Sequence, residues 1–410
     1  MPWAYRTAFK LFVFAIPIYV YIGLRLSTAI QQATENTRFR IPKGKSRLVY
    51  FISMGLIYIW PLILLYYMAR GNLSGFFVFS PQLQWQDYLF QFPAWWGLIL
   101  MAELLPLYLT LDLYGIIFLP KRKIDAGKIR TRKKIAILKI GLFLFFAFYI
   151  GVKTCLDTTR LRIDTDVIVI PGMAEPLNGL RINLFGDIHM SRYTVPEDLD
   201  LLNSLLQSNR EDMNFFSGDL TSRGRHFLPK ALNLIADPKA TIGNIACMGD
   251  HDYWTAAELI PTALYRRGWS FLHNKHRLYT YNGARILVTG ITYVYSQRID
   301  RRELNHLLST APKADLKILL VHQPRQFIAE TAADHKYHLM LAGHTHGGEV
   351  VPHVMGIPYS PGLIETPYCW GIHQLKGLRI IITNGIGRTL AKLRYHAPSQ
   401  IQRLILKNSE

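Results

Sequence analysis

The stretch Arg181-Ile-Asn-Leu-Phe-Gly-Asp-Ile-His189 predicts more about this chain than any other: an apolar run typical of a β-strand ends in glycine, aspartate and histidine. Four later apolar runs also lead into Asp or His: residues 213–216 before Asp219, 242–248 before Asp250, 317–321 before His322 and 337–341 before His344. Ligands of an open α/β sheet bind beyond the carboxyl ends of its strands, so five such ends in succession predict one site there.

The polar residues at these strand ends are of the kinds that bind transition metals. Alternate residues of an extended chain share one face, so Asp187 and His189 present two ligand groups on the same side, as do His344 and His346. Mixed nitrogen and oxygen ligands suit Mn, Fe or Zn rather than Mg or Ca alone. The pattern predicts a hydrolytic centre with two divalent, or mixed-valence, transition-metal ions.

The first part of the chain has the composition of a membrane region. Half of the 410 residues are hydrophobic and the mean hydropathy is +0.12, which is more apolar than is usual for soluble domains. We expect four transmembrane helices, at residues 11–24, 48–68, 93–119 and 135–151, the first of them lengthened by its flanks.

The domain organisation follows from these segments. We expect a four-helix transmembrane region over residues 1–153 and a catalytic domain over residues 154–410, with residues 154–165 as a short tether. The net charge of the chain is +19. Residues 1–153 hold 19 Lys or Arg and 5 Asp or Glu, whereas residues 154–410 hold 28 Lys or Arg and 23 Asp or Glu. The basic excess is therefore mainly a membrane-topology signal, and neither a nucleic-acid partner nor an exonuclease activity is expected.

The loops between the predicted helices alternate in charge. The first loop holds six Lys or Arg residues and the third holds eight, whereas residues 69–92 between them hold only Arg70. The positive-inside rule then places the first and third loops in the cytoplasm. This predicts a multi-pass protein of an inner or plasma membrane with an extracytoplasmic catalytic domain. The aromatic second loop, Phe76-Phe-Val-Phe79 and Trp85, would lie at the membrane–water interface on the same side as the catalytic domain.

Three ionisable residues fall within the predicted spans: Glu103, Asp112 and Lys139. Such groups are functional candidates in a membrane. Here we expect Asp112 to pair with Lys139 between the third and fourth helices, because the spans contain no second charged relay that would support transport.

The strand ends resemble the calcineurin-like metallophosphoesterase superfamily, whose pattern is D-x-H, G-D, G-N-H-[DE], H and G-H-x-H. All five blocks occur in order within residues 165–405. Thr383-Asn-Gly-Ile-Gly-Arg388 and Ala397-Pro-Ser-Gln-Ile401 resemble a membrane-associated or exported bacterial subgroup. The resemblance implies an α/β fold, a four-layer αββα sandwich, preceded here by an all-α bundle of four transmembrane helices.

The resemblance also implies a role for each motif residue. The metal ligands would be Asp187, His189 and His346 for the first ion, Asp219 for both, and Asp250, His322 and His344 for the second. Two ions about 3.5–4 Å apart lower the pKa of a bridging water, and the resulting hydroxide attacks phosphorus in line. His251, if protonated, would donate to the departing oxygen as a general acid.

One position departs from the family pattern. Asp250 stands where the family usually has Asn, so the assumed ligands carry a charge of −3 rather than −2. A bound cation's own charge dominates the electrostatics of such a site. We therefore expect tighter retention of the second metal and weaker activation of the substrate, in an enzyme that stays active. A trivalent iron would compensate for the added charge.

Substrate contacts are predicted at Arg192, Arg223 and Arg388, which follow the motif loops, because Arg suits phosphate recognition. Asp252 is expected to support its loop. We expect hydrolysis of a phosphodiester or phosphomonoester at or near the membrane, with lipid head groups and envelope polymers as candidate substrates.

Two alternatives stay open. A reversed topology fits a cytoplasm-facing UDP-diacylglucosamine-type pyrophosphate hydrolase of lipid A synthesis, and Asp250 fits a non-catalytic, metal-stabilised membrane sensor. The sequence specifies neither the substrate nor the oligomeric state.

Overall fold

The computed structural model describes residues 2–409 apart from residues 36, 71–82, 84, 86, 120–125, 209–210, 223–224 and 390, and for residues 2–8 it describes the backbone alone. The chain divides into two compact units. One comprises Met1–Cys155 with Pro352–Tyr359, and the other comprises Leu156–Val351 with Ser360–Glu410.

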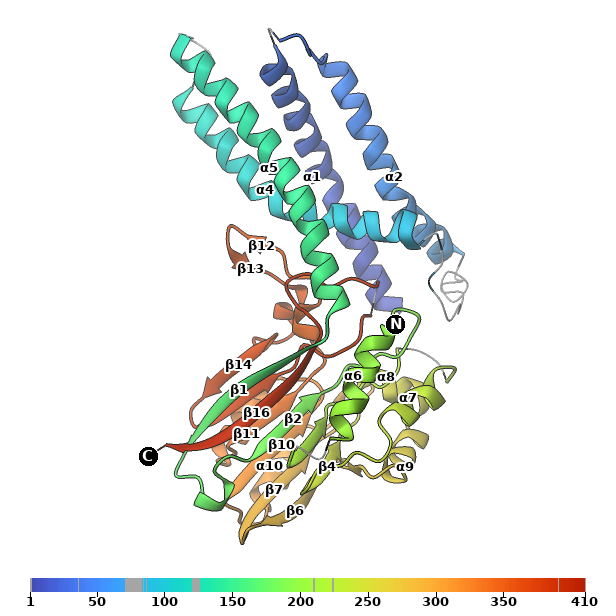
Figure 1. Cartoon of the computed structure of the whole chain (residues 1–410), viewed down its shortest axis with the longest axis vertical. Helices are drawn as coiled ribbons and strands as arrows, with labels where there is room; N and C mark the ends of the chain where they lie inside the picture. The colour runs from blue at the N-terminus through green and yellow to red at the C-terminus, as the bar shows by residue number, and fades with distance from the viewer. Residues whose placement is uncertain are drawn as a thin grey trace. The chain divides into compact units, whose positions relative to one another are not determined.

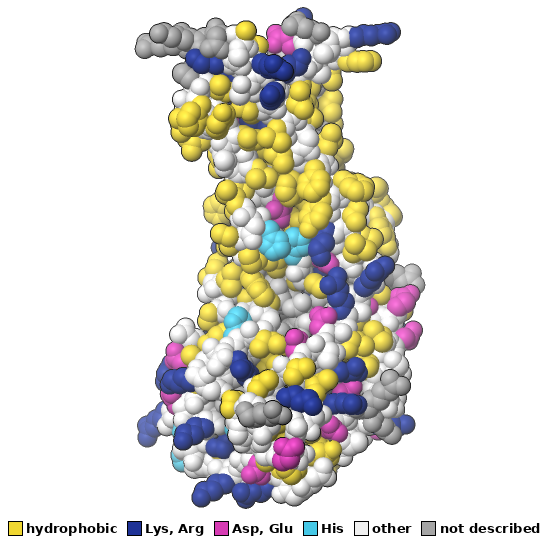
Figure 2. All heavy atoms as spheres, turned by 60° about the vertical axis from the view of Figure 1, so that its left-hand side comes forward, with side chains coloured by type: hydrophobic (Ala, Val, Ile, Leu, Met, Phe, Trp, Pro, Cys, Tyr) yellow, Lys and Arg dark blue, Asp and Glu magenta, His cyan; other side chains and the backbone are white. Residues whose placement is uncertain are grey.

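The first unit is built from long helices: α1 (Pro2–Thr34), α2 (Lys43–Ala69), α4 (Phe92–Phe118, preceded by the π-helix η1 at Asp87–Gln91) and α5 (Ala126–Thr159). The described residues hold four helices long and apolar enough to cross a membrane, as predicted. At about 1.5 Å per residue, the 27 residues of α2 exceed a hydrocarbon core of about 30 Å. Figure 2 shows hydrophobic side chains over this bundle and Lys and Arg gathered at one end of it.

The pairing predicted for Asp112 is confirmed. Its Oδ1 accepts a short hydrogen bond from Nζ of Lys139, while Oδ2 accepts one from Nε of Arg25 at 2.7 Å and one from the Tyr21 hydroxyl at 2.5 Å. Burying a charge is costly unless it is paired, and four groups from three helices here satisfy one another. This cluster has a structural explanation that requires no transported ion.

The second unit contains two six-stranded sheets (Figure 1). In order across the first sheet lie β1 (Arg162–Pro171), β16 (Gln400–Ser409), β2 (Arg181–Phe185), β3 (Met213–Phe216), β4 (Gly243–Ala246) and β5 (Ser270–Phe271). Across the second lie β14 (Gly371–Leu375), β15 (Leu378–Ile382), β11 (Leu339–Ala342), β10 (Leu316–Val321), β7 (Ala284–Gly290) and β6 (Lys275–Tyr281). Strands β2 to β5 are mutually parallel, as are β7, β10, β11 and β15.

Three buried clusters define four layers. One lies between the sheets, where Leu184 of β2 and Leu320 of β10 meet. A second lies between the first sheet and the helices α6 (Pro196–Leu206), α7 (Leu228–Leu234) and α9 (Leu259–Tyr265). A third lies between the second sheet and the helices α10 (Arg301–Ser309) and α11 (Gln326–Asp334). Because successive strand residues face opposite sides, Leu184 enters the central cluster and Phe185 the outer one. The predicted αββα sandwich is confirmed.

The prediction of a tether at residues 154–165 is wrong. Helix α5 continues to Thr159, and β1 begins at Arg162. Within the second unit, the Thr158 hydroxyl accepts the backbone N–H of Arg394 at 2.9 Å, and Asp157 Oδ2 accepts that of His396 at 2.7 Å. These partners lie more than 230 residues away in sequence, so no local pattern signals them.

Candidate metal centre

The five predicted strand ends converge on one buried cluster. The loops after β2, β3, β4, β10 and β11 bring together the seven predicted metal ligands, Asp187, His189, Asp219, Asp250, His322, His344 and His346. Six of these side chains are buried, and His344 is nearly so. Within each of several overlapping groups of three, the candidate ligand atoms lie within 4.8 Å of one another. The structure therefore brings together the seven side chains that the sequence singled out, and the role of each one is taken up in the proposed function.

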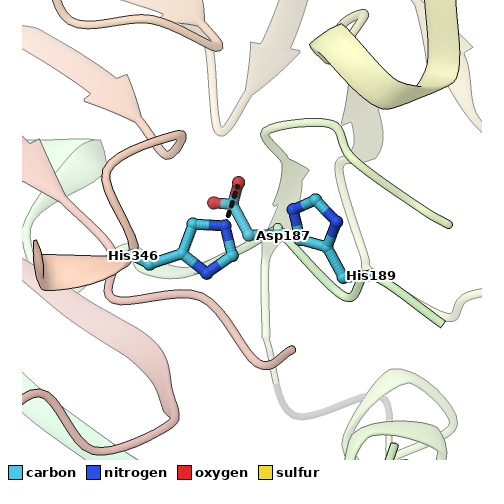
Figure 3. A group of neighbouring side chains, drawn as sticks. All are labelled: Asp187, His189 and His346. Carbon is cyan, nitrogen blue, oxygen red and sulfur yellow. Dashed lines mark ion pairs between the residues drawn. The ribbon is translucent and has the colours of Figure 1, made fainter. Parts of the chain in front are cut away.

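The first group comprises Asp187, His189 and His346 (Figure 3). The Asp187 carboxylate lies between the two imidazoles, and its Oδ1 is 3.6 Å from Nε2 of His346. Burial, together with His189 and Arg394, lowers the pKa of His346 well below its ordinary value. A neutral imidazole opposite a carboxylate is the form that ligates a metal.

Asp219 links this group to the second one. Its Oδ2 is 3.2 Å from Nε2 of His189 and 3.4 Å from Nε2 of His322, and its Oδ1 accepts the backbone N–H of His251 at 2.7 Å. Burial alone would raise the pKa of Asp219, but the neighbouring imidazoles of His322, His251 and His189 outweigh it and hold that pKa well below the ordinary value. An ionised carboxylate shared between two sets of imidazoles has the position of a bridging ligand.

The second group comprises Asp250, His322 and His344. Oδ2 of Asp250 is 3.3 Å from Nε2 of His322 and 3.0 Å from Nδ1 of His344. The other ring nitrogen of His322 donates to the carbonyl of Ser217 at 2.8 Å. That bond leaves Nε2 of His322 as the nitrogen that could bind a metal, because the partner of one ring nitrogen sets the tautomer of the other.

The residues present fit a pair of metal ions. Among the described side chains, Nε2 of His189, Nε2 of His322 and Nδ1 of His346 are buried without a hydrogen-bond partner. An unsatisfied buried polar atom costs about 1–3 kcal/mol. Two of them, Nε2 of His189 and Nε2 of His322, face carboxylate oxygens at 3.2–3.4 Å, beyond an ordinary N–H···O bond. Cations between these atoms would satisfy both partners, and the mixed N/O donors suit Mn, Fe or Zn.

The backbone at the site is held in an uncommon conformation. Five ligand residues have positive φ: Asp187 (47°), His189 (44°), Asp219 (61°), His344 (74°) and His346 (55°). Non-glycine residues in this region cost of order 1–3 kcal/mol each and cluster at functional sites. The glycines beside them are needed for space: a Cβ on Gly343 would lie 2.4 Å from Oδ2 of Asp187.

His251 stands beside the cluster, with its ring centroid 4.5 Å from that of His189. Its Nδ1 donates a short hydrogen bond to the Ser222 carbonyl, so Nε2 is the nitrogen open to a reactant. Burial, together with the neighbouring His189, lowers the pKa of His251 to about 4. The imidazole is therefore neutral near pH 7 until a negatively charged reactant stabilises its protonated form.

Asp252 supports the loop, as predicted. Its carboxylate accepts the backbone N–H groups of Asp219 at 2.8 Å, Leu220 at 2.8 Å and Gly249 at 3.1 Å. One side chain thereby ties the loop after β3 to the loop after β4, and it holds the bridging Asp219 in place.

The three arginines predicted to contact substrate have different surroundings. Arg223 lies outside the described residues. Arg192 is half-buried, and its Nη2 donates to the Tyr193 hydroxyl at 3.0 Å. Arg388 is 1% exposed, with Nη1 bonded to Asp198 at 2.8 Å and Nη2 to the Thr158 carbonyl. A guanidinium enclosed in this way joins parts of the fold, so the prediction of a substrate contact at Arg388 is wrong.

Sequence reasoning missed a set of side chains around the second group. Gln323 donates through Nε2 to both oxygens of Asp250, at 2.8 and 2.9 Å, and its Oε1 accepts from Arg325 at 3.0 Å. Arg325 forms an ion pair with Glu365, whose Oε1 is 3.4 Å from Nε2 of His344. Gln323 and Arg325 directly follow His322, so proximity in sequence was a usable signal. Glu365 lies 21 residues after His344, with no motif to mark it.

Comparison with known proteins agrees with this geometry. The profile of the calcineurin-like phosphoesterase family matches residues 180–348. An uncharacterized metallophosphoesterase of Bacillus subtilis, YkuE, is 26% identical over 268 residues, 62% of this chain and 86% of that protein. A transmembrane protein with metallophosphoesterase domain from Danio rerio is 23% identical over 367 residues, 85% of this chain and 81% of that protein. An uncharacterized metallophosphoesterase of Helicobacter pylori is 26% identical over 303 residues, 73% of this chain and 78% of that protein.

Proposed function

The chain belongs to the calcineurin-like metallophosphoesterases through residues 180–348, and on that premise we propose that it is a membrane-anchored, two-metal phosphoesterase. Its substrate is a phosphodiester or phosphomonoester at or near the membrane. One observation carries the proposal: seven Asp and His side chains converge at the carboxyl edge of two sheets. Several of their ring nitrogens are buried without a hydrogen-bond partner.

Each ligand has a role in this proposal. Asp187, His189 and His346 hold one ion, Asp250, His322 and His344 hold the other, and Asp219 is shared. When bound, two divalent or mixed-valence ions lower the pKa of water and offset the charge of the phosphoryl oxygens.

Hydrolysis forms one bond from the water oxygen to phosphorus and breaks the bond from phosphorus to the leaving oxygen. The attacking water gives up one proton, and the leaving oxygen takes one up. The side chain placed to supply that proton is His251, through Nε2, because Nδ1 is bonded to Ser222. A bound phosphoester is anionic and raises the pKa of the imidazole beside it, which opposes the lowering caused by burial.

The extra charge of Asp250 is accommodated by neutral donors. Its carboxylate accepts the backbone N–H of Tyr295 at 2.6 Å and two contacts from the Gln323 amide. These bonds stabilise an ionised aspartate without adding positive charge to the site. These hydrogen bonds support a catalytic centre rather than a non-catalytic, metal-stabilised sensor, because they hold the Asp250 carboxylate beside His322 and His344, where it could bind a metal.

The catalytic unit is proposed to lie outside the cytoplasm. Basic residues in the connection from α1 to α2 and in the first turns of α2 and α5, among them Arg38, Lys45, Arg130 and Lys134, are exposed, as the positive-inside rule expects of a cytoplasmic face. The loop between α2 and η1 lies mostly outside the described residues, including Phe76–Phe79. A reporter that is active only outside the cytoplasm, fused after Lys153, tests the side directly: an inactive fusion favours the reversed topology.

The activity is tested with the purified full chain. Metal is measured by elemental analysis, and turnover is measured on bis(4-nitrophenyl) phosphate and 4-nitrophenyl phosphate before and after chelation. We expect about two metal ions per chain, loss of turnover in Asp219→Asn, and no loss in the surface control Asp334→Asn. Metal-loaded native chain that hydrolyses neither compound would overturn the enzymatic proposal and favour the sensor.

A further inference from the structure

Residues 345–364 form a 20-residue excursion between two residues that contact each other at the metal centre, His344 and Glu365. His344 and Glu365 contact each other, with Nε2 and Oε1 3.4 Å apart, although residues 345–364 separate them in sequence. The base of the excursion is held within the catalytic unit: the Glu349 carboxylate accepts the backbone N–H of Thr389 at 2.8 Å, and the Thr345 hydroxyl donates to the Cys369 carbonyl at 2.7 Å. Both ends of this segment are therefore pinned at the second ligand group.

The middle of the excursion is a β-hairpin. Strands β12 (His353–Val354) and β13 (Ile357–Pro358) are antiparallel, and the two residues between them, Met355 and Gly356, both have positive φ, as a tight hairpin turn requires. Pro352–Tyr359 belongs to the compact unit of the membrane-spanning helices, not to the catalytic unit that surrounds it in sequence. The backbone N–H of His353 donates to Oε1 of Glu103 in α4 at 2.9 Å.

Glu103 has a role in this arrangement. It was one of three ionisable residues predicted at membrane depth, and it is 3% exposed. A buried carboxylate in an apolar helix is expensive unless it accepts hydrogen bonds. The hairpin supplies one such donor, so the carboxylate fastens this segment of the catalytic sequence to the helical unit.

The hairpin presents an apolar surface that its own fold does not cover. Val354, Met355, Ile357 and Tyr359 are 36, 64, 69 and 51% exposed, and residues 352–359 contain no Asp, Glu, Lys or Arg. Removing such apolar side chains from water is favourable. The unit to which the hairpin belongs holds four helices that are long and apolar enough to cross a membrane, so a bilayer is an environment that would cover this surface too.

We propose that the hairpin Pro352–Tyr359 contacts membrane lipid. Its exposed side chains are apolar, its segment carries no Asp, Glu, Lys or Arg, and it belongs to the same compact unit as the four helices that are long and apolar enough to cross a membrane.

Lipid contact is tested by spin labelling of the full chain in phosphatidylglycerol-containing nanodiscs. Cys155→Ser removes the exposed native thiol, since Cys247 and Cys369 are buried. A label at Met355→Cys should collide at least threefold more with oxygen, relative to a water-soluble nickel chelate, than a label at Tyr265→Cys, which is exposed on α9. Equal ratios at the two positions overturn the lipid contact, whatever the enzyme hydrolyses.

Discussion

Glu365 holds the His344 imidazole from the side opposite Asp250: Oε1 of Glu365 is 3.4 Å from Nε2, and Oδ2 of Asp250 is 3.0 Å from Nδ1. The Glu365 carboxylate is itself held by Arg325 and by the Tyr295 hydroxyl, 2.9 Å away. Burial alone would raise the pKa of Glu365, but the contact with His344, followed by Arg325 and Tyr295, lowers it to about 2. An ionised carboxylate therefore orients the imidazole of His344, whose Nδ1 faces Asp250 in the second candidate ligand group.

Replacing this carboxylate should weaken the second metal site. In Glu365→Gln we expect metal affinity at that site to fall about 10- to 100-fold, the usual cost of losing the partner of a ligating histidine. Titration of the metal-free chain with Mn²⁺ or Zn²⁺ measures it. The matched control is Glu330→Gln, which removes an exposed ion pair with Arg301 and should leave both sites unchanged. An unaltered second-site affinity in Glu365→Gln would contradict the positioning role.

The departure at Asp250 should depend on Gln323. In the native chain the Asp250 carboxylate accepts hydrogen bonds from the Tyr295 backbone N–H and from the Gln323 amide. In Asp250→Asn, the new NH₂ group is itself a donor and faces one of these donors, so that hydrogen bond is lost. We expect a loss of about 1–3 kcal/mol in the free energy of unfolding, and weaker binding of the second metal.

Adding Gln323→Glu to this variant should reverse both losses, because a carboxylate at position 323 accepts from the new amide, restores the charge of −3 and keeps the contact with Arg325. Thermal unfolding and metal titration of the three variants measure this. An Asn variant as stable as the native chain, with no gain from the second change, would refute the compensation.

Metal binding at the second site should release a proton. Burial alone would lower the pKa of His344, but its contacts with Asp250 and Glu365 outweigh it and raise that pKa to about 9. The metal-free imidazole is thus protonated at pH 7, while a ligand nitrogen must be unprotonated. Burial alone would also lower the pKa of His322, but Asp219 and Asp250 outweigh it and hold that pKa well above its ordinary value. Below about pH 9 the apparent affinity should therefore rise with pH, by up to about tenfold per unit for each displaced proton, and the rise should become shallower once His344 has lost its proton.

Metal titrations from pH 6.5 to 9.5 test this linkage. Glu365→Gln removes one of the contacts that raise the pKa of His344, so the rise in its affinity should become shallower at a lower pH. A native affinity independent of pH over this range would contradict the linkage.

The parts of this protein that sequence predicted share a local signal. Strands β2 and β3 begin and end at the predicted residues because apolar runs closed by glycine are a short-range pattern. The clustering of the candidate metal ligands followed from those ends, since parallel strands bring their carboxyl ends to one edge.

The parts that sequence missed depend on long-range contacts. The end of α5 at Thr159 is held by Arg394, and Glu365 reaches His344 only because the hairpin excursion closes on itself. Arg388 was mistaken for a substrate contact because its partner, Asp198, lies 190 residues away. An arginine near a phosphate motif and an arginine inside a core have the same local sequence.

The charge cluster of the helical unit gives a prediction that is independent of catalysis. Asp112 and Lys139 have side chains 15% and 8% exposed, so removing one leaves the other charged and largely enclosed. Breaking such a pair costs about 3–5 kcal/mol, whereas replacing both residues by apolar ones of similar volume is often tolerated. Asp112→Leu should therefore lower the unfolding temperature of the helical unit, and D112L/K139L should recover most of the loss, since Arg25 is 46% exposed and can reach water. Unfolding in detergent, followed by far-ultraviolet circular dichroism, measures both variants while metal content reports on the catalytic unit. If the double variant is no more stable than Asp112→Leu, then Asp112 has a role in the membrane beyond pairing with Lys139.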